Sequence, residues 1–345
     1  MTLSSRLPAA ARLLLPVLLF AHAAVASAAE RVRVPSPWAA GQTVVYEDEA
    51  VQRDAADPGG PSTRRVTDRT EIRVEAAGRD GIALAWTTRD SRVEAVDGDR
   101  VMADLLAPVL ASLDEVPVTI ELDRDGRYRH VRDLDALTER VRAAMLPAFL
   151  ANLEHSFGDD DKVGKYDRDA AIDAARKDLQ ANMDTIVSRD SVESGAVMQQ
   201  RLLSAFVGKT LVAGRRYTDR APILSPIEGH PLPGLREYTL EIDREDPSLA
   251  RIRWTHRLDT DGDPAALWSL AKELGAEALG EGRPRDLVLE ETGTLLFRRE
   301  TGLVELLETT DRSKYGAVHD EEGRHRMRRV GTDRTWAQEE VARRR

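Results

Sequence analysis

Apolar positions in this chain recur over a distance much longer than a solenoid repeat. Four of them return 168 positions later in the sequence. The first set is Ile72, Val74, Leu84 and Trp86, and the second is Leu240, Ile242, Ile252 and Trp254. Solenoid units run to roughly 20–50 residues, so this period indicates a duplicated subdomain. We therefore predict two similar antiparallel half-sheets that share one core.

Within each copy, the alternation of apolar and polar residues predicts pairs of strands. In the first copy a turn at 77–81 separates the two strands. Further positions recur 167 residues later, which predicts a second equivalent strand pair around a glycine. These positions are Ile120, Leu122, Gly126 and Tyr128, followed by Leu287, Leu289, Gly293 and Leu295. One-sided apolar helices are expected at 105–113 and 267–274.

A helical insert separates the two copies. Its first helix carries an apolar stripe at every third or fourth residue, made of Leu134, Leu137, Val141, Met145, Phe149 and Leu153. A second helix is predicted over 167–206, with an interruption near Gly195. Packing these helices on the concave face of the sheet would bury both apolar surfaces. The predicted fold is therefore α+β, a curved sheet or half-barrel with a first β-rich repeat at 29–132, the insert at 133–206 and a second β-rich repeat at 207–345.

The first 28 residues are typical of a secretory signal peptide. Arg6 and Arg12 precede an apolar run at 13–20, and Ala26-Ser27-Ala28 forms a small-residue cleavage site. The run is too short to span a bilayer, so we expect cleavage near Ala28 and no transmembrane segment in the mature chain. The chain has no cysteine, which excludes a lipid anchor, disulfides and thiol chemistry. The sequence thus predicts an exported protein, periplasmic or secreted, that is not a lipoprotein.

The charge balance argues against a nucleic-acid partner. The chain has 60 acidic and 50 basic residues and a net charge of −10. An acidic surface repels the phosphate backbone and favours solubility. We predict no metal, no cofactor and no nucleic acid.

Several short motifs resemble catalytic or ligand-binding signatures without completing them. The segment 208–210 lacks the earlier glycine of a phosphate-binding loop, where Leu203 stands. The S-x-x-K match at 269–272 lacks its partner motifs, so a helix surface is expected there. Acidic clusters at 159–161 and at Asp259, Asp261 and Asp263 could hold calcium through oxygen ligands. A calcium loop that starts at Asp159 has Val163 and Ala170 where ligands belong, and solvated acidic turns are expected for both clusters.

Two features of the C-terminal region allow more than one interpretation. His319 and His325 enclose three carboxylates, a pattern that suggests a zinc site, but a polar hairpin tip is favoured. Alternating Arg324, Arg326 and Arg328 suggest either contact with anionic lipid headgroups or a charged edge strand, and we favour the edge strand.

The order of elements resembles the lipoprotein-carrier superfamily of LolA-like and LppX-like proteins. The resemblance is carried by the G-x-x-x-x-Y opening from Gly41 to Tyr46, the strand pairs, the helices inserted between them and the export signal. It implies a curved half-barrel that holds helices against its concave face. No binding residue of that family matches a numbered position here.

Three hypotheses for function follow. The leading one is a binding or carrier protein for an apolar or lipid-like ligand, without catalysis, with a cavity between sheet and helices. Its candidate lining residues are Leu84, Trp86, Ile252 and Trp254, although repeated core packing is the favoured role of the two tryptophans. The second is an envelope protein–protein interaction module with an exposed apolar patch or open sheet edge and no cavity. The third is an enzyme of unrecognised type, with converging polar groups for example around His319 and His325.

Overall fold

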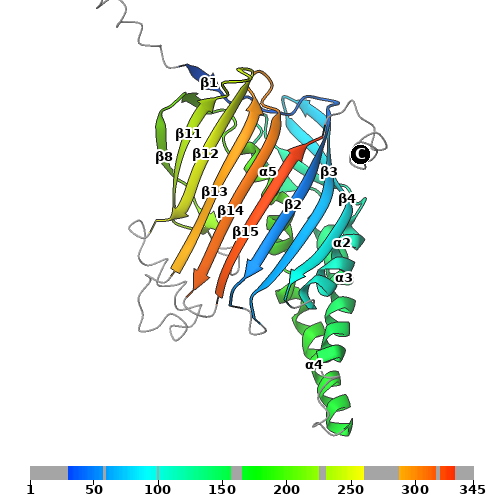
Figure 1. Ribbon diagram of the computed structural model, residues 1–345. Coiled ribbons are helices and arrows are strands. Elements are labelled where there is room, and N and C mark those ends of the chain that lie inside the picture. Colours follow the sequence, from blue (N-terminus) through cyan, green and yellow to red (C-terminus); the bar gives the residue numbers. More distant parts are fainter. Residues whose placement is uncertain are drawn as a thin grey trace, which may run out of the picture.

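The computed structural model describes residues 30–56, 60–98, 101–156, 165–224, 231–259, 287–315 and 319–330. These ranges form a large antiparallel sheet with helices behind it (Figure 1). The predicted signal peptide, the acidic cluster at 159–161, the S-x-x-K match and the helix expected at 267–274 lie outside the described residues.

The main sheet has 11 strands in the order β6-β5-β4-β3-β2-β15-β14-β13-β12-β11-β8. The first copy contributes β2 (Thr43–Asp54), β3 (Ser62–Gly78), β4 (Gly81–Asp97), β5 (Val118–Leu122) and β6 (Tyr128–Val131). The second contributes β8 (Arg216–Arg220), β11 (Gly234–Ile242), β12 (Leu249–Leu258), β13 (Leu287–Arg298), β14 (Val304–Tyr315) and β15 (His319–Arg329). The two half-sheets are joined where β15 pairs with β2. The predicted α+β fold, an open curved sheet with helices, is confirmed.

Two small ladders lie beside the main sheet. The first pairs β1 (Arg31–Arg33) with β7 (Thr210–Val212), and the second pairs β9 (Ile223–Leu224) with β10 (Pro231–Leu232). The first ladder ties the beginning of the described chain to the segment that leaves the helices.

The strand pairs expected from the 168-residue recurrence are present, but their registers differ by two residues. Ile72 faces Trp86 across β3 and β4, whereas Leu240 faces Ile252 across β11 and β12. A shift of two residues keeps every side chain on its own face of the sheet, so both copies still bury the same apolar positions.

The second recurrence does not mark equivalent structure. Gly126 lies in the turn between β5 and β6 with a positive φ of 82°, as expected. Gly293 lies inside the continuous strand β13, opposite Trp254 on β12. A methyl group at Gly293 would overlap the Trp254 ring, so this glycine makes room for an aromatic side chain and does not turn the chain.

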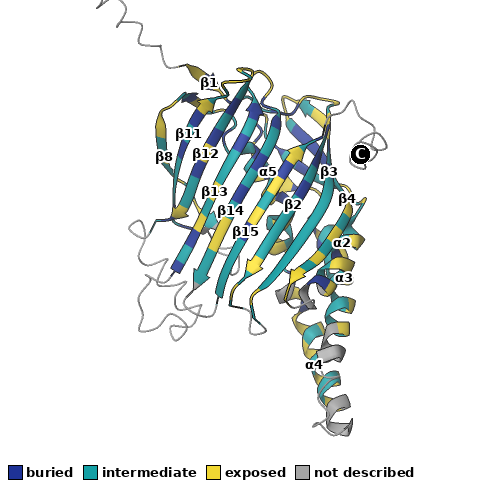
Figure 2. Ribbon diagram, in the orientation of Figure 1, coloured by how far each residue is buried: buried dark blue, intermediate teal, exposed yellow. Residues whose placement is uncertain are grey.

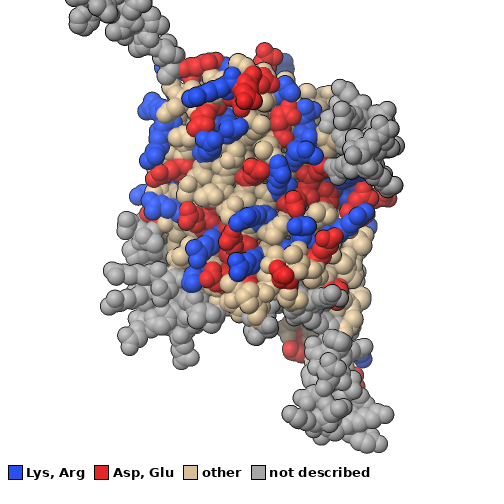
Figure 3. All heavy atoms as spheres, viewed as in Figure 1, with Lys and Arg blue, Asp and Glu red and all other residues tan. Residues whose placement is uncertain are grey.

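Buried and more exposed positions alternate along the strands, as the bands of colour in Figure 2 show. The inward side chains form one core that includes both copies, with Tyr46, Ile72, Leu84, Leu240, Ile252 and Phe297 among its members. On the outward face, basic and acidic side chains are intermingled (Figure 3). The period of two therefore separates an apolar inner face from a charged outer face.

The helices are α2 (Val101–Leu113), α3 (Leu134–Ser156), α4 (Lys165–Ile186) and α5 (Arg189–Ser204). Helix α5 packs on the inner face, where Val197 and Leu203 join the core. Helix α4 packs along α3 and extends past the ends of the strands (Figure 1), so only part of the insert covers the sheet. No helix within the described ranges combines the length and apolar character needed to cross a bilayer.

The interruption predicted near Gly195 is misplaced. The chain breaks at Val187–Ser188, and Gly195 lies inside α5. Ser188 caps α5, because its hydroxyl accepts a hydrogen bond from the Ser191 backbone N–H at 3.1 Å. A capping serine, rather than the glycine, therefore marks the boundary.

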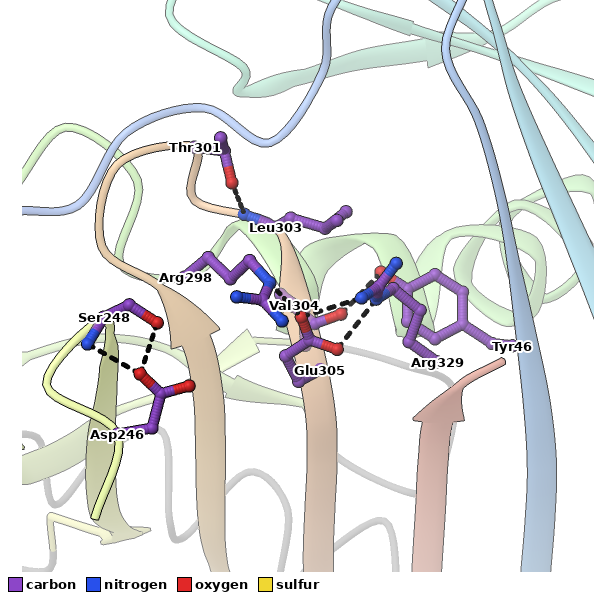
Figure 4. Close-up of polar contacts among 9 residues, drawn as sticks. All are labelled: Tyr46, Asp246, Ser248, Arg298, Thr301, Leu303, Val304, Glu305 and Arg329. Atoms are coloured by element: carbon purple, nitrogen blue, oxygen red, sulfur yellow. Dashed lines mark hydrogen bonds and ion pairs between the residues drawn. The ribbon is translucent and has the colours of Figure 1, made fainter. Parts of the chain in front are cut away.

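At the junction of the two halves, polar contacts join strands β2, β14 and β15 (Figure 4). The hydroxyl of Tyr46 donates to the Val304 carbonyl at 3.2 Å. Glu305 accepts hydrogen bonds from Arg329 through both carboxylate oxygens, at 2.8 and 3.0 Å, and from Arg298 at 2.6 Å. These side chains connect strands that are far apart in the sequence.

Candidate functional site

A cavity of about 490 Å³ lies between the inner face of the sheet at β4 and the helices α2, α3 and α5. Its apolar wall comes from all four elements, and includes Trp86, Leu110, Leu113, Val141, Met145 and Val192. The position matches the space between sheet and helices that the carrier hypothesis predicts. Its size is within the range of about 300–1,000 Å³ found for small-molecule sites.

The apolar wall is only partly covered by the rest of the protein. Val141 and Met145, from the stripe predicted on α3, are half-buried instead of fully buried. Met198 on α5 also lines the cavity and is 55% exposed. Apolar side chains left in contact with water around a concavity are typical of surfaces that bind an apolar partner or ligand.

One end of the cavity is polar and acidic. Asp68 on β3 and Gln199 on α5 both line it. The amide nitrogen of Gln199 donates to Asp48 on β2, and the other oxygen of Asp48 lies 2.7 Å from His325 Nε2 on β15. The cavity wall thus leads from apolar side chains to a buried group of carboxylates around one histidine.

These buried groups have shifted ionisation. Burial, followed by the negative charge of Asp48, raises the pKa of Asp68 to about 7. Burial disfavours the charged form of His325, but its hydrogen bond to Asp48 and the charges of Asp48, Asp68 and Asp311 outweigh this and raise its pKa. Burial also raises the pKa of Asp311. The buried carboxylates and His325 thus influence one another's ionisation.

His325 is enclosed, with 10% of its side chain exposed, and Asp48 is more so, at 3%. Within the described residues, the Nδ1 atom of His325 is buried and has no hydrogen-bond partner. Asp68 accepts one hydrogen bond there, from the Thr70 hydroxyl at 3.3 Å. The Asp48–His325 pair is thus held by the fold, whereas Asp68 faces the cavity with free hydrogen-bonding capacity.

The four predicted lining residues occupy different places. Trp86 lines the cavity, but Leu84 and Ile252 are fully buried in the core. Trp254 packs against Phe206, with ring centroids 5.6 Å apart, and donates from its indole nitrogen to Glu291 at 2.7 Å. The structure therefore brings one of the four to the cavity, and a role of any of them in ligand contact stays a prediction.

The two candidate zinc-ligand histidines are separated along β15. His319 Nε2 lies 2.6 Å from the Ser313 hydroxyl, near the start of the strand, while His325 meets Asp48 six residues later. The segment that contains both is a strand and not the hairpin tip we expected, because it pairs along its length with β14 and β2.

The arginine-rich segment was also interpreted wrongly as an edge strand. Strand β15 lies in the middle of the sheet, between β14 and β2. Its arginines form ion pairs: Arg324 with Glu322, Arg326 with Glu308 and Arg328 with Glu47. The outward face of β15 is consequently a mixture of both charges and not a basic patch (Figure 3).

The remaining motifs take structural roles where they are described. Lys209 forms an ion pair with Asp219 at 2.5 Å, in the segment that follows α5. Asp259 forms an ion pair with Arg220 at 3.4 Å, while Asp261 and Asp263 lie outside the described residues. Across the described ranges, His, Asp and Glu side chains do not gather in any group of three able to hold a metal ion.

Sequence reasoning missed Asp48, Asp68 and Gln199. A signal for Asp48 was available, because it continues the alternation Val44, Tyr46, Asp48 on the buried face of β2. A carboxylate at an inward position needs a partner, and such positions mark either a functional site or a buried ion pair. The partner itself could not be read from the pattern, since His325 is 277 residues away.

Comparisons with known proteins add little about function. No protein-family model and no curated protein matches the chain. Among solved structures, a lipovitellin chain described under "Lipid-protein interactions in lipovitellin" is similar over 85% of this chain, with 9% sequence identity and a TM-score of 0.42. This chain covers 25% of that lipovitellin chain. Function at this level of likeness has to come from the geometry of the site.

Proposed function

We propose that this protein binds and carries an apolar or lipid-like ligand in the cavity between β4 and helices α2, α3 and α5, without catalysing a reaction. The observation that carries the proposal is the partly exposed apolar wall of a cavity of about 490 Å³. A ligand that covers this wall would remove apolar surface from water, which contributes about 25 cal/mol for each Å² buried.

Export is part of the proposal. The leader expected at 1–28 would direct the protein to the periplasm or the medium, where an apolar molecule needs a protein to shield it from water. Resemblance to the lipoprotein carriers is consistent with such a role but identifies no ligand, because one fold can support many functions.

The polar end of the cavity is the observation that would favour an enzyme instead. Perturbed ionisation next to a cavity is common in active sites. In the described residues, however, His325 contacts Asp48 and Gln199 and no hydroxyl group that it could activate. The arrangement supports ligand recognition better than nucleophilic catalysis.

The interaction-module hypothesis has a weaker basis. The sheet is open at β6 and β8, as that hypothesis requires. It also predicts that no internal cavity exists, and the cavity beside β4 argues against it.

A cavity-filling variant tests the proposed function. Val141 lines the cavity on α3, whereas Ala143 on the same helix is exposed. We expect Val141→Trp to weaken binding of the neutral fluorescent probe N-phenyl-1-naphthylamine by roughly tenfold or more, with Ala143→Trp unchanged. Equal probe binding by both variants, or no binding by the folded wild type, would contradict the proposal.

A further inference from the structure

The cavity has an unequal distribution of charge along its wall. Its described lining includes Asp68 but no lysine or arginine. Ser91, another lining residue, donates to Asp114 through both its backbone N–H, at 3.1 Å, and its hydroxyl, at 2.5 Å. Three carboxylates therefore lie around the polar end: Asp48 on β2, Asp68 on β3 and Asp114, the residue that follows α2.

Two basic groups on elements beside the cavity are already engaged. His325 is buried and lies against Asp48. Arg142 on α3 donates to the Val187 carbonyl at 3.0 Å and forms ion pairs with Glu139 and Asp184. An anionic ligand group at Asp68 would meet negative charge, and the described lining supplies no lysine or arginine to balance it, which disfavours phosphate and carboxylate headgroups.

We propose that the ligand is an amphiphile with a cationic, ammonium-type nitrogen, which binds against Asp68 while its apolar chain lies along α3 and α5. This inference rests on the proposed function and adds the chemical class of the ligand to it. An ammonium group donates hydrogen bonds and carries positive charge, and both properties complement a carboxylate that has one described hydrogen-bond donor. The apolar chain would cover Val141, Met145 and Met198.

The ionisation of Asp68 predicts how such binding depends on pH. The groups whose charges act on Asp68 are Asp48 on β2, Asp114 after α2 and His325 on β15, while α5 contributes the neutral Gln199. A pKa of about 7 means that part of the Asp68 population is protonated at neutral pH. A bound cation stabilises the carboxylate, so its affinity should rise between about pH 6 and pH 8 as Asp68 loses its proton.

Three ligands with the same dodecyl chain test the inference. Dodecylamine, dodecanol and dodecanoate are titrated below their micelle concentrations or solubility limits as competitors of N-phenyl-1-naphthylamine. We expect dodecylamine to bind about tenfold or more tightly than the other two at pH 8, and to lose much of this advantage at pH 6. Dodecanol should show no such pH dependence.

Two Asp→Asn variants make the test specific to the site. Asp68→Asn should remove the preference for the amine and its pH dependence, but it should still bind dodecanol. Asp90→Asn is the matched control, because the Asp90 side chain is 64% exposed and pairs with Arg69. Folding of both variants is checked by their thermal unfolding curves.

The outcomes separate the two proposals. Equal binding of amine and alcohol, tighter binding of dodecanoate, or an unchanged preference in folded Asp68→Asn would overturn the assignment of an ammonium headgroup while leaving an apolar-ligand carrier intact. Failure of all three compounds and the probe to bind the folded protein would overturn both.

Discussion

His325 Nε2 lies 2.7 Å from Asp48 Oδ1, and this contact connects β15 to β2 at the junction of the two half-sheets. Both side chains are enclosed by the sheet and by α5. A buried charge that loses its partner is strongly destabilising, whereas replacement of the whole pair by apolar residues can be nearly neutral. Single and double substitutions of this pair therefore measure how much the contact stabilises the junction of the two half-sheets.

We expect His325→Leu to lower the free energy of unfolding by about 3 kcal/mol at pH 6, because Asp48 is left buried without its cationic partner. The double variant Asp48→Leu/His325→Leu should recover much of that loss. Urea unfolding of the wild type, both single variants and the double variant measures the coupling. Additive losses in the double variant would show that the two residues do not form an energetic pair.

The raised pKa of His325 sets a direction for the pH dependence of its contribution. Its stabilisation is fully present below about pH 6.5, the ordinary pKa of histidine, and declines as pH rises through the raised value. The difference between wild type and His325→Leu should therefore shrink above neutral pH. A difference that grows with pH would contradict the ion pair.

Asp68 is expected to destabilise the protein at high pH. Its pKa is raised to about 7, so the folded state holds a proton that the unfolded state releases near pH 4, and stability falls as pH rises between these values. Asp68→Asn avoids this loss, and we expect it to increase the free energy of unfolding by about 2 kcal/mol at pH 8. At pH 4 the two proteins should be nearly equal. A less stable Asp68→Asn protein at pH 8 would contradict the burial of this carboxyl.

Arg329 should be less tolerant of substitution than its neighbour Arg328. Arg329 contacts both oxygens of Glu305, and 18% of each side chain is exposed. Arg328 contacts Glu47 at 2.9 Å but is 57% exposed. Lysine cannot reproduce the bidentate contact of Arg329 with Glu305. We therefore expect Arg329→Lys to lower the free energy of unfolding by about 1 kcal/mol and Arg328→Lys by less than about 0.5 kcal/mol, measured by urea unfolding. Equal effects would show that the Glu305 contacts add no stability.

Position 293 should tolerate only glycine, because the Trp254 ring occupies the space that a side chain there would need. In Gly293→Ala the new methyl group meets the Trp254 ring, and overpacking of this kind costs roughly 1–3 kcal/mol. The same substitution in a Trp254→Leu background should cost much less, because the ring is gone. A double-mutant cycle from urea unfolding measures this coupling. An equal cost in both backgrounds would place the strain elsewhere on β13.

The strand pairs were predictable because the sheet buries only one face. Ile72, Val74, Leu84 and Trp86 alternate with polar residues, and the structure places all four on the inner face. The same alternation could not reveal the two-residue difference in register between the copies, since such a shift leaves the buried face unchanged. It also could not distinguish Gly126, which lies in a turn, from Gly293, which lies under a tryptophan.

The candidate site was predictable only in outline. The apolar stripe of α3 and the position of the insert led to a cavity between sheet and helices, with Trp86 in its wall. Its acidic end depends on the pairing of β2 with β15, which brings Asp48 to His325 across most of the chain. Local periodicity predicts which face a residue occupies, but it does not identify a partner strand at such a distance.

The central claim is that the cavity beside β4 holds an apolar or lipid-like ligand. Native mass spectrometry of the protein purified from the cells that produce it, followed by organic extraction, tests this most directly. We predict a reproducible additional mass that extracts into organic solvent and that is reduced in Val141→Trp but not in Ala143→Trp. A clean ligand-free mass from a folded wild-type sample that also fails to take up added dodecyl amphiphiles would contradict the account.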